Sequence, residues 1–130
     1  MVNLLEQGLA WMNGMRDRHL ATPVRYCRGN RSVDLAATVG RTTAEVSRDH
    51  GLFERIEARD YIVTAAELVI DGDPILPSPG DRILEEQDNR RLIHEVMNLD
   101  EEPCFRWCDP FHITMRIHTK HISTEAASRR

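Results

Sequence analysis

Apolar and polar residues alternate with a period of two through most of the chain after Pro23. The first two alternating runs are separated by Gly29-Asn30, a dipeptide that favours a tight hairpin turn. Their apolar positions are Val24 and Tyr26, then Val33, Leu35, Ala37 and Val39. This pattern predicts an antiparallel strand pair with one face in solvent. We expect Gly40 to bend or bulge the second strand, which then continues briefly through Thr42–Ser47.

The central stretch contains the longest apolar run and the densest turn signals. Tyr61–Ile70 is rich in β-branched residues and predicts a strand that starts after a corner at Arg59-Asp60. Asp71-Gly72-Asp73 predicts a tight turn. Three prolines in Pro74–Pro79 remove backbone donors, so this segment should run as a rigid, exposed loop before a new strand starts at Asp81.

Three further runs predict strands in the second half of the chain: Ile83–Glu86, Arg90–Asn98 and His112–Ile122. Acidic turns join them. The last run alternates cleanly, which predicts a strand with one face in solvent. Its two sets of positions are Ile113, Met115, Ile117 and Thr119 against Thr114, Arg116, His118 and Lys120.

Residues 3–20 follow a helical period instead, with apolar positions three and four residues apart. This helix covers the core or contacts a neighbouring subunit, and Trp11 and Met15 are the candidates for such a contact. The sequence therefore predicts a mainly β fold in one domain of 130 residues. Its parts are an N-terminal helix at 1–22, a small antiparallel β-barrel at 23–123 and a flexible tail at 124–130.

The composition narrows the classes of function. Seventeen Lys and Arg against 21 Asp and Glu give a net charge of −4, which argues against a protein that coats DNA. No signal peptide or membrane span is apparent, so we expect assembly in the cytoplasm. Three cysteines in a domain of this size are expected to be free thiols.

Four segments in a fixed order carry a family resemblance: Ala36–Arg41, Arg59–Val63, Asp71–Pro74 continuing through Pro79–Ile83, and Phe105–Phe111 leading to Arg116–Lys120. Together they resemble the head-to-tail joining proteins of tailed phages and prophages, a family that includes the head-closure or stopper proteins of siphophage necks. The resemblance spans about residues 24–122. Cys108 stands where that family is expected to have serine.

The resemblance implies a non-enzymatic structural protein without cofactors, located in the virion neck after assembly in the host cytoplasm. It implies a homo-oligomeric ring of six or twelve copies that closes the head and joins it to the tail. The implied partners are the portal-adaptor protein, the tail-terminator or tail-tube protein, and the packaged DNA in the channel. A tail terminator or another neck protein of the same particle is the alternative.

The proline-rich loop is the candidate subunit interface. Prolines order it in advance, so little conformational entropy is lost when it docks on a neighbour. Two exposed apolar residues between the prolines favour an interface over a plain surface crossover, which is the alternative. The interface candidates in this region are Asp71, Asp73, Pro74, Ile75, Leu76 and Pro77.

Acidic clusters are candidates for the wall of a DNA channel, because carboxylates repel phosphates and would keep moving DNA from sticking. Simple solvated turns are the alternative reading. The candidate residues are Glu85, Glu86, Asp88, Asp100 and Glu101.

A zinc site is the main alternative chemistry. Cys104, Cys108 and His112 are weak candidate ligands, followed by His118 and His121. Their spacing does not suit a zinc knuckle, and the apolar residues between the cysteines indicate an apolar turn, so we predict no metal. No catalytic motif is present. Basic and aromatic residues interleave at Arg25–Arg28 and Phe105–Trp107, as in single-strand binders, but the negative charge and 5% aromatic content argue against a nucleic-acid-binding barrel.

Overall fold

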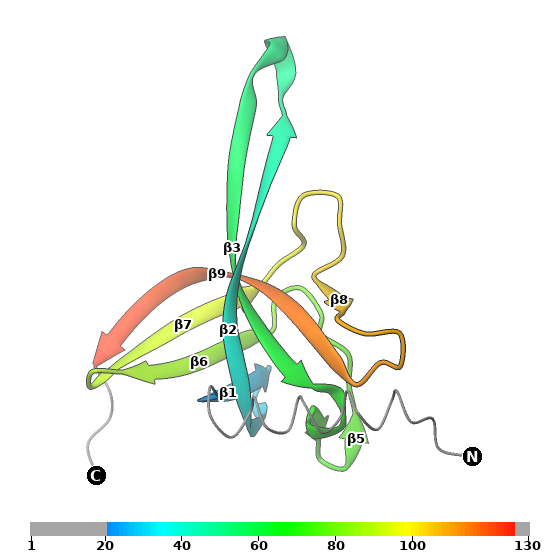
Figure 1. The fold of residues 1–130 in the computed structure, drawn as a ribbon. Helices are drawn as coiled ribbons and strands as arrows, with labels where there is room; N and C mark the ends of the chain where they lie inside the picture. Colours follow the sequence, from blue (N-terminus) through cyan, green and yellow to red (C-terminus); the bar gives the residue numbers. More distant parts are fainter. Residues whose placement is uncertain (1–20, 127–130) are drawn as a thin grey trace.

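The computed structural model describes residues 21–126, and these residues confirm the mainly β class (Figure 1). Two short 3-10 turns, η1 (Asp49–Gly51) and η2 (Ala65–Glu67), interrupt the strands. The helix predicted for residues 3–20, with Trp11 and Met15, lies outside the described residues. The strands are β1 (Thr22–Arg28), β2 (Arg31–Ser47), β3 (Phe53–Thr64), β4 (Val69–Ile70), β5 (Asp73–Pro74), β6 (Arg82–Gln87), β7 (Arg90–Val96), β8 (Phe105–Trp107) and β9 (Thr114–Ala126).

The main sheet has the strand order β3-β2-β1-β6-β7-β9-β8, and all of its pairings are antiparallel. β3 also pairs with β9, from Arg59 opposite Thr119 to Thr64 opposite Thr114. The pairings from β3 through β9 therefore close into a cycle. β4 and β5 form a separate two-stranded ribbon.

The predicted hairpin turns are confirmed. Arg28 pairs with Arg31 across Gly29-Asn30, and Gly29 takes a positive φ of 61°. Asp71 and Gly72 have φ of 52° and 83°, which lets β4 turn directly into β5. Glycine, aspartate and asparagine adopt this region at low cost, which is why such dipeptides are readable from sequence.

β2 and β3 form a hairpin that extends well beyond the strands that pair with it. β1 pairs with β2 only as far as Ala37, whereas β2 and β3 stay paired from Thr38 to Ser47. The distal part extends away from the other strands as a two-stranded arm (Figure 1). The bulge predicted at Gly40 is wrong, because the register continues through Gly40 opposite Asp60. A Cβ on Gly40 would lie 3.4 Å from the Arg116 guanidinium, so the glycine leaves room for that group.

The predicted strand Tyr61–Ile70 is also divided differently. β3 ends at Thr64, η2 follows, and only Val69–Ile70 returns to strand. Arg59-Asp60 is not a corner, because both residues lie within β3 and Asp60 is fully buried. The core is built from inward-facing residues of several strands together with Leu68, and its largest members include Tyr26, Tyr61, Ile83, Met115 and Ile117.

β9 differs from the predicted amphipathic strand in one important way. Met115, Ile117 and Thr119 are buried as expected, but His118 on the opposite face is also buried. A hydrogen bond with the Asp60 carboxylate satisfies its ring there. The strand continues to Ala126, opposite Arg90, so the first part of the predicted tail is paired backbone. Trp107, predicted as part of an apolar turn, lies instead in strand β8 (Phe105–Trp107).

Candidate functional site

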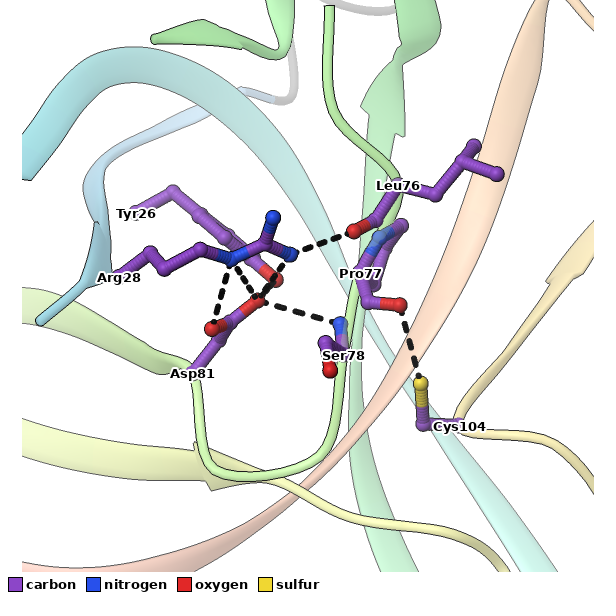
Figure 2. A network of polar contacts seen from close by, with 7 residues as sticks. All are labelled: Tyr26, Arg28, Leu76, Pro77, Ser78, Asp81 and Cys104. Carbon is purple, nitrogen blue, oxygen red and sulfur yellow. Dashed lines mark hydrogen bonds and ion pairs between the residues drawn. The ribbon is translucent and has the colours of Figure 1, made fainter.

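The loop Pro74–Pro79 is held in place by a polar network centred on Asp81 (Figure 2). Arg28 donates from Nη2 to Asp81 Oδ2 at 2.8 Å and from Nε to Asp81 Oδ1 at 3.1 Å. The same Nη2 donates to the Leu76 carbonyl at 2.6 Å. The Tyr26 hydroxyl and the Ser78 backbone N–H also donate to Asp81. Burial, followed by the contact with Asp81, raises the pKa of Tyr26.

A second anchor lies on the other side of the loop. Pro77 is buried, and its carbonyl accepts a hydrogen bond from the Cys104 thiol at 3.5 Å. Burial raises the pKa of Cys104, which keeps this thiol protonated and able to donate. Ile75 packs partly against the core. Leu76 is 54% exposed, and Figure 2 shows its side chain pointing away from the network.

The structure therefore separates the interface candidates into two groups. Ile75 and Pro77 face inward and fix the loop. The surface group consists of Asp71, Asp73, Pro74 and Leu76, all exposed, although Asp71 also lies 3.3 Å from the Arg31 guanidinium.

The channel candidates separate in a similar way. Glu85 is 3% exposed and accepts hydrogen bonds from Arg59 and from the Tyr61 hydroxyl, each at 2.8 Å. It is part of the interior rather than of an exposed acidic surface. Glu86, Asp88, Asp100 and Glu101 are exposed. Glu86 lies at the end of β6 and Asp88 in the β6–β7 turn, whereas Asp100 and Glu101 lie in the β7–β8 loop, which is well apart from that turn in Figure 1.

The three weak zinc candidates lie in different surroundings. Cys104 donates to Pro77, Cys108 is exposed, and His112 stacks on Trp107 with ring centroids 4.1 Å apart. Residues 21–126 contain no group of three or more His, Cys, Asp or Glu side chains placed to hold a metal ion. The segment is organised instead by Asp109, whose carboxylate accepts from the backbone N–H groups of Phe111, Ile113 and Thr114.

A buried ionic group at the base of the arm was not anticipated from the sequence. Arg116 Nη1 lies 2.9 Å from Asp60, and His118 Nδ1 lies 2.8 Å from it. The Thr42 hydroxyl also donates to this carboxylate. Burial alone would raise the pKa of Asp60, but hydrogen bonds from His118, Thr42 and Arg116 outweigh it and lower the pKa. This group ties the arm to β9.

The arm ends in an apolar tip. Leu52 is 66% exposed and Phe53 is 75% exposed. Together with Leu76 they are the exposed large apolar side chains among residues 21–126. Exposed apolar groups at a protruding position are typical of a contact with another protein.

A cavity of about 600 Å³ opens at the other end of the arm, where the arm leaves the sheet. Basic side chains predominate among its charged lining, with Arg41, Arg59 and Lys120 against Glu57, and His94 and His121 also line it. His94 is buried beside Tyr61, with its Nδ1 3.1 Å from the tyrosine hydroxyl. Burial, assisted by the nearby Arg59 and His121, lowers the pKa of His94 to about 4.

A comparison with known protein families identifies the family of this chain. The family model described as phage head-tail joining protein matches residues 2–126. The chain belongs to the phage head-tail joining protein family. This confirms the resemblance seen in the sequence. No curated protein sequence matches this head-tail joining protein.

Membership gives the coarse function. Head-tail joining proteins are phage structural proteins and are generally non-enzymatic, so the chain is a structural protein of the bacteriophage virion. The family implies a location in the neck and contacts with other head and tail proteins. In the described part of this chain, no helix has the length and apolar character needed to cross a membrane.

Proposed function

We propose that this head-tail joining protein forms a homo-oligomeric ring in the neck of a siphophage-type particle, where it closes the filled head and joins it to the tail. The observation that carries the proposal is the family match over residues 2–126. The ring would contain six or twelve copies. Its neighbours would be the portal-adaptor protein on the head side and the tail-terminator or tail-tube protein on the other.

The fold supports such a role. The closed cycle of strand pairings fits a small antiparallel β-barrel, whose closure leaves few free strand edges outside the arm. The Asp81 network holds the proline-rich loop in place, and the Asp60 group holds the base of the arm. A loop fixed in this way suits an assembly component, because it is ordered before it docks.

The loop around Leu76 is one proposed contact with a neighbouring protein. Its backbone is fixed by Arg28 and Cys104, so the exposed leucine is presented in one position. The exposed acidic residues Glu86, Asp88, Asp100 and Glu101 are proposed to face the DNA path. Their charge would discourage adhesion of the phosphate backbone.

Deletion of the gene tests this function. Particles lacking the protein should accumulate as separate tails and as heads that lose their DNA, and adding the purified protein to extracts of these particles should restore joined particles. Joined particles with normal infectivity in the deletion strain would contradict the proposal. Tails of irregular length would favour the alternative function, a tail terminator, since that protein sets where the tail tube ends.

A further inference from the structure

The distal part of the β2–β3 arm pairs with no third strand, and outside the arm its end meets an ion pair between Arg48 and Asp100 at 3.8 Å. Beyond Arg59 opposite Thr119, no pairing joins β3 to β9, and beyond Ala37 none joins β2 to β1. An isolated two-stranded hairpin is marginally stable in water. Residues 48–53 at its end include both of the most exposed large apolar side chains among residues 21–126. An arm of this kind gains stability by docking on another surface.

The charges of the arm favour a protein over DNA as that surface. Arg48 pairs with Glu54 at 2.7 Å and Arg41 with Glu57 at 3.7 Å, and Glu45 stands opposite Arg55 in the register. The arginines are thus matched by carboxylates along the arm and leave no basic stripe for phosphates. Asp49 at the tip has no ion-pair partner within residues 21–126.

The cavity at the base of the arm has complementary properties. Its volume of about 600 Å³ can accept the side chains of Leu52 and Phe53. Val39, Gly40 and the stems of Arg41 and Lys120 provide apolar surface. Lys120 has no ion-pair partner in the described part of the chain, and a cation beside an aromatic ring is itself attractive.

We infer that the arm tip of one copy docks into the basic cavity at the arm base of the next copy in the ring. Leu52 and Phe53 would fill the cavity, and Asp49 would pair with Lys120. This inference rests on the proposed ring, and it identifies the partner of the arm as a second copy of the same chain.

The arm tip cannot reach the cavity of its own chain. Phe53 is six residues along β3 from Arg59, which pairs with Thr119 at the cavity, so tip and cavity are roughly 20 Å apart. Tip and cavity are different surfaces, so the contact is heterologous and repeats from copy to copy. Such a contact produces a closed ring when the rotation between copies is suitable.

Disulfide trapping in assembled particles tests the contact. A chain carrying Phe53→Cys and Lys120→Cys, with Cys27→Ser and Cys108→Ser to remove accessible thiols, should give on oxidation a ladder of covalent oligomers that stops at the size of the ring. A disulfide within one chain is excluded because the two Cα atoms must approach within about 7 Å. The matched control pairs Phe53→Cys with Asp34→Cys, which is exposed on β2 away from the cavity, and should give no ladder.

Charge reversal provides a second, independent readout. Asp49→Lys or Lys120→Asp alone should lower the yield of joined particles at least tenfold, and the two together should restore it, since both residues are exposed and their replacement spares the fold. The inference is overturned if Phe53→Cys links only to another protein or to the same position of a second copy, if no ladder forms, or if the double reversal rescues nothing. A ladder in particles whose neck does not contain this protein would instead overturn the proposed function, but it would leave the contact between copies standing.

Discussion

Arg28 donates hydrogen bonds to both carboxylate oxygens of Asp81, from Nη2 at 2.8 Å and from Nε at 3.1 Å, and its Nη2 also donates to the Leu76 carbonyl. One arginine therefore connects the end of β1 to the start of β6 and to the loop that precedes β6. The Asp81 side chain is 7% exposed, so this carboxylate is an interior group with three kinds of donor around it. The position of the loop depends on it.

Replacing Asp81 should weaken the fold. Asp81→Ala leaves the Tyr26 hydroxyl and the Arg28 guanidinium without their acceptor, and loss of one partner of a buried pair costs about 3 kcal/mol. The free energy of unfolding in urea measures this. Asp34→Ala is the matched control, because Asp34 forms an exposed pair with Arg25 at 2.7 Å and its loss should cost at most about 1 kcal/mol. Equal effects of the two substitutions would contradict the role of Asp81.

Leu76→Ser should separate folding from assembly. The backbone of the loop is fixed by neighbouring groups, so a polar side chain at this exposed position should change the free energy of unfolding by less than about 1 kcal/mol. The purified variant should nevertheless restore fewer joined particles in deletion extracts, whereas Leu76→Met should restore them normally. Full restoration by Leu76→Ser would show that the loop is a plain surface crossover.

Asp60→Ala should destabilise the base of the arm. The substitution leaves Arg116 and His118 without their shared carboxylate, and the expected loss is about 3 to 5 kcal/mol in the free energy of unfolding. Amide hydrogen exchange should also become faster along the proximal arm, because the Thr42 hydroxyl loses its acceptor. Glu57→Ala, which removes only an exposed partner of Arg41, is the control. Unchanged exchange in Asp60→Ala would contradict the anchoring role.

Stability should fall in mildly acidic solution because of His94. Its pKa is about 4 in the folded chain and about 6.5 when unfolded, so the unfolded chain binds more protons between these values. The free energy of unfolding should therefore drop by up to about 1.4 kcal/mol per pH unit from pH 6.5 down to pH 4, with no such loss above pH 6.5. The Asp60 carboxylate, with its lowered pKa, acts in the same direction only below this window.

His94→Gln isolates this effect. The variant should show a flatter dependence of stability on pH between 6.5 and 4, while the exposed His121→Gln should keep most of the slope. Denaturation curves recorded at pH 7 and pH 5 are sufficient. An unchanged slope in His94→Gln would mean that another group titrates in this range.

The sequence predicted the features that depend on local chemistry. Gly29-Asn30 and Asp71-Gly72 carry their turns in their own backbone preferences, and the pairing of β1 with β2 follows from alternation. The arm was missed because its length depends on where β1 and β9 stop pairing, which no local pattern records. The Asp60–His118 pair joins residues 58 positions apart, so neither residue could be recognised as buried from its neighbours.

The loop illustrates the same limit at a finer level. Its prolines predicted a rigid, exposed loop, and the segment after Pro74 has no regular secondary structure, but Pro77 within it is buried. Its fixation depends on the carbonyls of Leu76 and Pro77, which accept from Arg28 and Cys104. Backbone acceptors are present at every residue, so sequence gives no sign of which ones are used. Ile75 and Pro77 consequently looked as exposed as Leu76.

The place of this chain in the particle is the most direct test of its function. Cryo-electron microscopy of intact particles, combined with antibody labelling of this protein, should locate it at the head-to-tail junction as a ring with sixfold or twelvefold symmetry. Label found on the capsid shell or at the distal end of the tail, with none at the junction, would contradict the proposed role.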